Sequence, residues 1–253
     1  MALSDVERNI YRLKLFRKNM GVSTPKYIVQ KFWSEEDLCK LSEVRINNKI
    51  SKQKYKIVKE NIKKFMVFDW VRFISITGSV AAGNAKEEDD IDILIVVKND
   101  RMWLYRGVLV LKLGFNSIRR VWGKRTKDKI DTNFICEERG VFFPWKNIFT
   151  LHELLFMLPV YNESYYEYIL SVNADLLKSF SIRKSVENVN NRRNRFLGVF
   201  NTLAFCTQYL YMLLMRHRPN LKRLRENNKG GRIEFFPQDF QARKLKEYEK
   251  MSK

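Results

Sequence analysis

Two short apolar runs rich in β-branched residues constrain the fold of this chain more than any other feature. They read VRFISI at 71–76 and IDILIVV at 91–97, and Gly78 ends the first of them. Runs of this length and composition are typical of buried β-strands. A third candidate strand, KIDTNFIC, lies at 129–136. Patterns typical of helices lie on both sides of this segment. The sequence therefore predicts an α+β (mixed α/β) protein with a mixed sheet, flanking helices and a C-terminal helical region.

Carboxylates gather at the start of the second run. Because side chains alternate along a strand, Asp90 and Asp92 should point to the same face of the sheet. If the third strand pairs nearby, Asp131 adds a third carboxylate, and Asp128 is the alternative at that position. Oxygen ligands of this kind suit hard divalent cations, Mg²⁺ above all, with Mn²⁺ as a substitute. Three carboxylates can hold two metal ions about 3.5–4 Å apart, an arrangement that serves phosphoryl displacement.

The turn before these carboxylates fits the same chemistry. Gly78 directly follows a strand and allows a tight turn, and Ser79 offers a hydroxyl beside backbone N–H groups. Such a turn can hold terminal phosphates. A P-loop is excluded, because Asn84 and Ala85 stand where that motif needs Lys and Ser or Thr. A Rossmann fingerprint would need a further glycine and a helix in place of the acidic loop.

A simpler explanation of the acidic stretch is a hairpin loop whose carboxylates are only solvated. That explanation suits Glu87, Glu88 and Asp89. It does not suit Asp92, which lies inside an apolar run where an unpaired charge is costly. The sequence therefore favours a metal site that includes Asp92.

The segment GSVAAGNAKEEDDIDILIVV resembles the G-S-x(n)-D-h-D signature of the DNA polymerase β-like nucleotidyltransferase superfamily. The version is that of small bacterial and archaeal nucleotidyltransferase-domain proteins. The resemblance covers roughly residues 67–140 and implies a mixed sheet with flanking helices. It also implies that Asp90 and Asp92 bind metal, and that Gly78 and Ser79 contact a triphosphate.

Two positions fit the family pattern less closely. The family signature is weak at the third-strand carboxylate. Asp131 therefore matches that position less securely than Asp90 and Asp92 match the first two positions. Many small members have an arginine and a glycine shortly after the serine, whereas this chain has Ala82 and Gly83. The role of that arginine must be vacant or filled from elsewhere, and the candidates are Lys86, Arg106, Arg119 and Arg120.

The function that the resemblance implies is transfer of a nucleoside monophosphate from an NTP, with ATP as the expected donor, to an acceptor, with release of pyrophosphate. Asp90 and Asp92 would bind both metal ions. Asp131 would complete the second site and accept, or help to remove, the acceptor's hydroxyl proton. Gly78 and Ser79 would hold the β- and γ-phosphates. Two alternatives stay open: a non-catalytic module that binds nucleotides or nucleic acid, and a toxin–antitoxin-type partner that nucleotidylates a protein.

Three segments are expected along the 253 residues: an N-terminal helical extension at 1–66, the catalytic core at 67–140 and a C-terminal helical accessory region at 141–253. The net charge of +20 comes mainly from the two ends of the chain, which suggests polyanionic partners. The acceptor could be RNA, a protein or a small molecule. Because the basic residues are dispersed over several helical patterns, a small or protein acceptor is favoured.

One stretch, residues 196–215, carries no charge and is about the length of a membrane span. Four polar residues interrupt it, namely Asn201, Thr202, Thr207 and Gln208. We therefore expect a buried core helix and no membrane association. The N-terminus lacks the apolar region of a secretory signal, and the cysteines form no CxxC pair. Both features predict a cytoplasmic protein.

Overall fold

A mixed β-sheet lies at the centre of the protein. The computed structural model describes residues 3–33, 49–113, 127–214, 220–234 and 240–252. Within them, five strands form one sheet in the order β4-β1-β2-β3-β5. The strands are β1 (Val71–Ile76), β2 (Ile91–Val97), β3 (Ile130–Glu137), β4 (Leu158–Tyr161) and β5 (Arg232–Glu234). β2 is antiparallel to β1 and parallel to β3, and both edge strands are antiparallel to their neighbours. The predicted α+β fold is confirmed, and the predicted strands form its centre.

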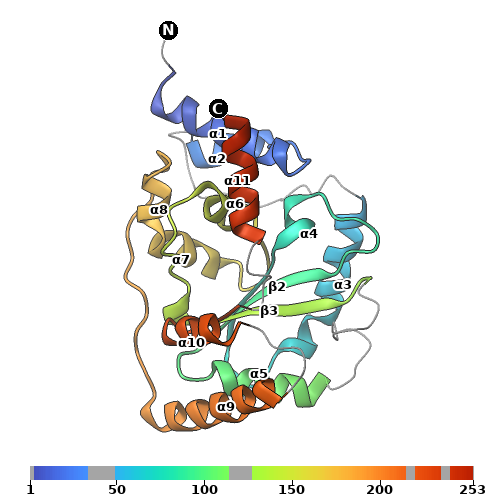
Figure 1. Cartoon of the computed structure of the whole chain (residues 1–253), viewed down its shortest axis with the longest axis vertical. Coiled ribbons are helices and arrows are strands. Elements are labelled where there is room, and N and C mark those ends of the chain that lie inside the picture. Colours follow the sequence, from blue (N-terminus) through green and yellow to red (C-terminus); the bar gives the residue numbers. More distant parts are fainter. Residues whose placement is uncertain (1–2, 34–48, 114–126, 215–219, 235–239, 253) are drawn as a thin grey trace.

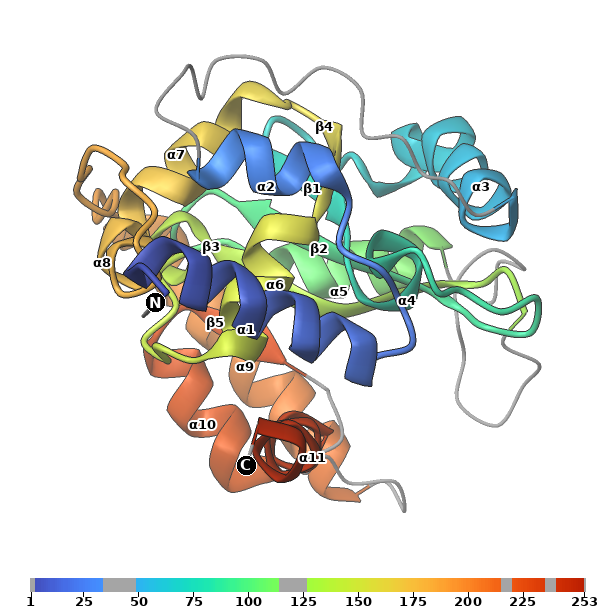
Figure 2. The same cartoon turned by 90° about the horizontal axis from the view of Figure 1, so that it is seen from above.

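Helices cover both faces of this sheet (Figure 1 and Figure 2). One face packs against α1 (Asp5–Asn19), α2 (Lys26–Trp33), α6 (Ile148–Phe156), α7 (Ser164–Val172), α8 (Ala174–Lys178) and α11 (Phe240–Ser252). The other packs against α3 (Lys49–Phe65), α4 (Gly78–Ala82), α5 (Met102–Leu113), α9 (Arg195–Leu214) and α10 (Leu221–Lys229). A short 3₁₀ turn at Glu138–Gly140 follows β3. The sheet therefore separates two apolar cores.

The pleat of β2 assigns its side chains to these two cores as predicted. Leu94 and Val96 belong to the core beneath α6 and α7. The alternate side chains, Ile91, Ile93, Ile95 and Val97, belong to the core beneath α3 and α5. Asp92 shares the face of Leu94, because residues two apart along a strand point the same way. The carboxylate therefore faces the side of the sheet that α1 and α6 cover.

The C-terminal part of the chain contributes more than helices. The expected helices are present as α6 to α11, but β4 and β5 add two edge strands to the central sheet. Their sequences, LPVY and RIE, are only four and three residues long. Runs this short carry too few alternations for a strand pattern to be detected. Short edge strands also limit pairing with other chains.

The described part of the uncharged stretch, residues 196–214, lies in α9. The expectation that this helix is buried in the core is wrong. Only Met212 is buried among the residues of α9. Leu203 and Leu210 are each 57% exposed. The helix is long and apolar enough to cross a membrane, with 11% of its most apolar window buried. We expected no membrane association because we expected this helix to be buried. Since α9 is largely exposed, burial no longer supports that expectation.

Exposure of α9 changes the expected cost of truncating it. Leu203→Ala should change the free energy of unfolding by about 0.5 kcal/mol or less, because the side chain has little packing to lose. The matched change in the core, Leu151→Ala, removes a side chain with 0% exposure and should cost about 2–5 kcal/mol. Urea unfolding of both variants measures the difference. A loss of several kcal/mol in Leu203→Ala would mean that α9 is covered in solution.

Candidate active site

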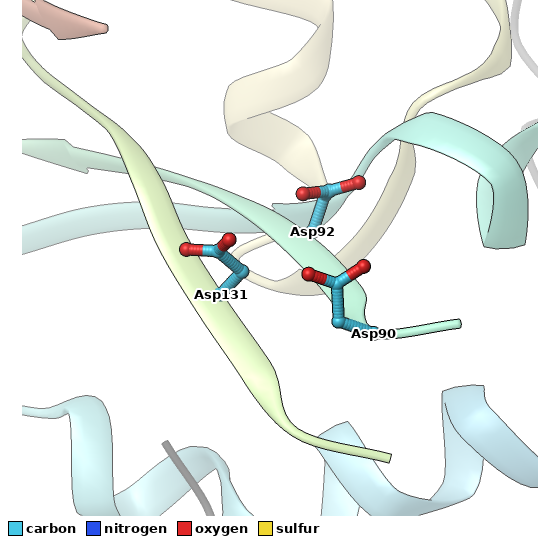
Figure 3. A group of neighbouring side chains, drawn as sticks. All are labelled: Asp90, Asp92 and Asp131. Atoms are coloured by element: carbon cyan, nitrogen blue, oxygen red, sulfur yellow. The ribbon is translucent and has the colours of Figure 1, made fainter. Parts of the chain in front are cut away.

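The structure brings Asp90, Asp92 and Asp131 together at one end of the two central strands (Figure 3). β2 and β3 run parallel, and Asp92 lies directly opposite Asp131 in their register. Asp90 immediately precedes β2. One carboxylate oxygen from each residue lies within 4.8 Å of the other two. Asp131 is buried, while the other two aspartates are half-buried and reachable from a neighbouring pocket.

Asp128, the alternative third carboxylate, is bound elsewhere. Its Oδ1 accepts a hydrogen bond of 2.8 Å from Nζ of Lys54 on α3. The Lys54 side chain is 1% exposed and also donates to the backbone carbonyl oxygens of Glu87 and Asp89. Lys54 thus ties the acidic loop to the chain just before β3. The carboxylate cluster contains Asp131, and Asp128 holds the loop that leads into it.

The acidic loop is in part the solvated loop that the simpler explanation predicted. Glu87 and Glu88 are exposed, and Glu87 pairs with Lys127 at 2.5 Å. The hydrogen bond and charge of Lys127 hold the pKa of Glu87 below its ordinary value. Any stabilisation from this pair is therefore present above the ordinary glutamate pKa and is lost as the pH falls through the lowered one. Since both side chains are accessible to water, that contribution is small.

Gly78 makes the close approach of the turn to Asp92 possible. The Thr77 N–H donates to the carbonyl oxygen of Asp92 at 2.9 Å, which fixes the turn against β2. Gly78 has φ +63°, a backbone conformation that favours glycine. A Cβ at this position would lie 2.5 Å from Oδ2 of Asp92. Both the backbone angle and the neighbouring carboxylate therefore require glycine here.

Ser79 is the second residue of the short helix α4, beside the carboxylates. Its hydroxyl donates to Oδ2 of Asp89 at 3.1 Å, and the same oxygen accepts from the Lys86 N–H at 2.9 Å. Asp89 thus closes the loop onto the glycine turn. These contacts of Asp89 hold the loop in position, and sequence reasoning did not single out this residue. Ser79 also lines the pocket, and its hydroxyl oxygen can still accept a hydrogen bond.

Arg17, a residue that sequence reasoning missed, supports the same turn from the other side. It lies on α1 and is 2% exposed. Its guanidinium donates to the carbonyl oxygens of Ser23 and Ala82 and hydrogen-bonds Nε2 of His152 at 2.9 Å. It also lies 3.7 Å from the ring centroid of Phe156. Arg17 therefore connects α1, α6 and the C-terminal end of α4, and His152 is a hydrogen-bonded core residue.

Of the candidates proposed to replace the missing family arginine, Arg106 is not brought to this turn. Arg106 donates to Gln208 and packs over Trp103, in the contact between α5 and α9. Lys86 is exposed. Arg119 and Arg120 lie outside the described residues. Among the part of the chain that the structure describes, Arg17 is the arginine whose guanidinium touches α4.

Replacing Arg17 should destabilise the fold strongly. Arg17→Met keeps a long side chain but leaves the Ser23 and Ala82 carbonyl oxygens without these donors, so we expect a loss of about 2–4 kcal/mol. Arg12→Met, an exposed position on the same helix, should cost less than about 1 kcal/mol. Denaturant unfolding of both variants tests this. Equal stabilities would show that Arg17 does not hold the turn.

A pocket of about 540 Å³ opens beside the carboxylates. The glycine turn, Asp90 and Asp92 line one part of it. Another part is apolar and comprises Leu94, Phe134, Phe143, Trp145, Phe149, Leu154 and Met157. Two basic side chains, Arg223 on α10 and Lys244 on α11, complete the lining, and sequence reasoning did not single them out. Each also has an acidic partner, Glu234 for Arg223 and Glu247 for Lys244.

This arrangement has the chemistry of a site for a phosphorylated, partly apolar ligand. Carboxylate oxygens can hold divalent cations, basic side chains attract phosphate, and aromatic side chains accept a flat ring. Most of the basic stretch at 119–129 lies outside the described residues. Its described end, Lys127–Lys129, borders the acidic loop.

Comparison with known proteins agrees with the site. Neither a search of curated proteins nor a search of solved structures finds a match. A family model, that of the nucleotidyltransferase domain, matches residues 59–196. The matched segment contains the glycine turn, the three clustered aspartates and the pairing of β1, β2 and β3, and it covers more than half of the chain. The chain therefore belongs to the nucleotidyltransferase domain family, consistent with the DNA polymerase β-like superfamily, and is a transferase enzyme.

Proposed function

We propose that this enzyme transfers a nucleoside monophosphate from an NTP, with ATP as the expected donor, to a hydroxyl-bearing acceptor, in a Mg²⁺-dependent reaction that releases pyrophosphate. The observation that carries the proposal is the cluster of Asp90, Asp92 and Asp131, whose carboxylate oxygens lie within 4.8 Å of one another beside a pocket. The family match supports nucleotidyl transfer in general. What we propose beyond that match is the identity of the metal, of the donor and of the acceptor.

The residues present fit a hard divalent cation. All three side chains of the cluster offer oxygen atoms, which Mg²⁺ and Mn²⁺ prefer over nitrogen or sulfur. Two half-buried carboxylates and one buried one can approach a cation without unfolding the strands that carry them. Bound there, the metal would neutralise phosphate charge and polarise the phosphoryl group under attack. Asp90 and Asp92 would hold both ions, and Asp131 would complete the second site.

The chain's own residues supply positioning and charge. Backbone N–H groups at Gly78 and Ser79, together with the serine oxygen, would hold the β- and γ-phosphates. Arg223 and Lys244 would add positive charge on another part of the lining. Asp131 would accept, or help to remove, the acceptor's hydroxyl proton. Holding the reacting groups in place is expected to provide most of the rate enhancement.

The pocket supports a small-molecule or protein acceptor over a long nucleic acid. Its volume of about 540 Å³ falls within the range of about 300–1,000 Å³ that is common for small-ligand sites. Phe134, Phe143 and Trp145 offer an apolar surface for the base of the donor. We also propose that the segments 1–66, 67–140 and 141–253 act as separate domains, as expected from the sequence.

Transfer of a labelled α-phosphate tests the proposal. The protein would be incubated with each NTP carrying label at either the α- or the γ-phosphate, in Mg²⁺ or Mn²⁺, with RNA, protein or aminoglycoside acceptors. We expect α-label on one acceptor and γ-label in pyrophosphate. Metal-dependent NTP binding without transfer to any acceptor would favour the non-catalytic module instead. Transfer that persists in excess EDTA would contradict the proposed metal site.

A further inference from the structure

One face of α9 forms an apolar stripe that the described part of the chain leaves exposed. The exposed side chains recur at helical spacing, and each is between 45% and 74% exposed. They are Phe196, Val199, Phe200, Leu203, Leu210, Tyr211 and Leu214. A helix of this length is about 30 Å long. Contiguous apolar surface of this extent usually marks a binding site for a protein or a membrane.

The opposite face of α9 carries polar side chains beside the apolar ones, Phe205 and Met212, that pack against the core. Asn201 accepts hydrogen bonds from the backbone N–H groups of Trp103 and Leu104, at 2.7 and 3.3 Å. Gln208 donates to the Trp103 carbonyl oxygen at 2.9 Å and accepts from Arg106. These contacts fix α9 on α5. They also orient the helix so that its apolar stripe faces away from the protein.

The charges in the sequence around α9 are of one sign. Residues 188–225 contain eight lysines and arginines and no aspartate or glutamate. Five of the basic residues flank the apolar stretch, with Arg192, Arg193 and Arg195 before it and Arg216 and Arg218 after it. Arg193 pairs with Asp100, while Arg192 and Arg195 are exposed. An apolar stripe bordered by positive charge is complementary to an anionic lipid surface, where the acyl chains meet apolar groups and the headgroups meet the arginines.

We propose that α9 docks the enzyme on the surface of a membrane that contains anionic lipids, with the helix lying in the plane of the interface. The helix does not span the bilayer in this proposal. Spanning would pull Asn201 and Gln208 from their partners on α5 into hydrocarbon and would uncover Trp103, which is 0% exposed. A helix that lies flat buries the stripe and keeps every one of these contacts.

A second copy of the chain is a poorer occupant of the same face. If two α9 helices packed parallel, the arginines at the start of one would meet those of the other. In either orientation these arginines would find no acid to pair with on the partner's α9 or α5, whose described residues contain none.

The docking face is separate from the candidate active site. Among the described residues that line the pocket, none lies on α9. In Figure 1, α9 lies along the lower edge of the molecule, whereas α4 and the strand ends beside it lie higher in the view. Docking through α9 would therefore leave the pocket open. The inference does not depend on the proposed reaction, and its test uses no activity.

Flotation with vesicles tests the proposal. Wild-type protein would be mixed with vesicles of phosphatidylcholine alone, or with about 30% phosphatidylglycerol, and centrifuged through a density gradient. We expect flotation with the anionic vesicles and weaker flotation with the neutral ones. Leu203→Glu should lower the vesicle affinity by on the order of tenfold or more, because one buried leucine is lost and a negative charge is added. The double variant with Leu210→Glu should not float.

The matched control is Leu3→Glu, since Leu3 is 52% exposed and precedes α1 at the other end of the molecule. It should float like the wild type. Thermal unfolding should be unchanged in all variants, because each replaced side chain is largely exposed. Failure of the wild type to float, or flotation of the double variant, would overturn the proposal. So would resistance to carbonate extraction, which indicates spanning, or a dimer in light scattering that Leu203→Glu dissociates, which indicates self-association.

Discussion

Replacing Asp92 by asparagine should lower metal-dependent nucleotidyl transfer by roughly 10³-fold or more, because charge stabilisation by a bound metal is worth several kcal/mol. Asp92 lies opposite Asp131 and belongs to the carboxylate cluster. Asparagine has nearly the same shape, so the packing of β2 is kept. Removing one of three neighbouring negative charges should leave the stability of the metal-free protein unchanged or raise it. The variant should therefore be folded and inactive.

Binding can be measured without knowledge of the acceptor. Mg²⁺ or Mn²⁺ together with a non-hydrolysable NTP should raise the Tm of the wild type, because ligands that bind only the folded state stabilise it. Asp92→Asn should lose most of this shift. Asp175→Asn, an exposed aspartate on α8, controls for the chemical change and should behave like the wild type. A full metal-dependent shift or full turnover in Asp92→Asn would show that the cluster is not the metal site.

The central strands and the first two carboxylates could be predicted from the sequence because both follow from the period of a β-strand. Alternation along IDILIVV separates Ile93 and Ile95 from Leu94 and Val96, and the two cores contain them in that division. The same alternation places Asp92 on the face of Leu94. No longer-range information is needed, since the pattern is contained within seven residues.

The choice between Asp131 and Asp128 could not be made from the sequence, because it depends on a distant residue. Lys54 lies on α3, and its ammonium group holds Asp128 and the acidic loop. The sequence did contain a sign that these basic side chains are buried. Lys54 falls on the stripe that buries Val58 on α3, and Arg17 falls on the stripe that buries Leu13 on α1. A basic residue at a core position of an amphipathic helix must find polar partners, although the sequence does not say which.

The position of α9 was misjudged because apolar composition does not reveal which neighbours a helix has. Asn201 and Gln208 looked like interruptions of a core helix. They are seven residues apart, so they lie on one face, and that face binds α5. Phe205 and Met212 pack inward beside them, but most of the large apolar residues lie on the opposite, exposed face. Whether a helix is buried depends on the elements around it, and α9 has a neighbour within the chain on one face only among the described residues.

Replacing Gly78 by alanine should weaken metal binding strongly, although no ligand is removed. The new Cβ would lie 2.5 Å from Oδ2 of Asp92, closer than such contacts occur, so the Asp92 side chain or the turn must move. Because the clash falls on one member of the cluster, its geometry is lost. We expect a loss of activity of about 10²-fold or more, since displacements of about 1 Å can cost this much.

Gly83 provides the matched control for this change. It also has a positive φ, +83° against +63° for Gly78, but nothing lies within 4 Å of the position that a Cβ would take there. Alanine in the left-handed conformation costs about 1–2 kcal/mol at either site, so both variants should lose similar stability from the backbone. Only Gly78→Ala should also lose the Tm shift with metal and NTP. If both variants bind metal equally well, the glycine turn does not set the position of Asp92; if both lose binding, backbone strain in α4 is responsible and the clash is not.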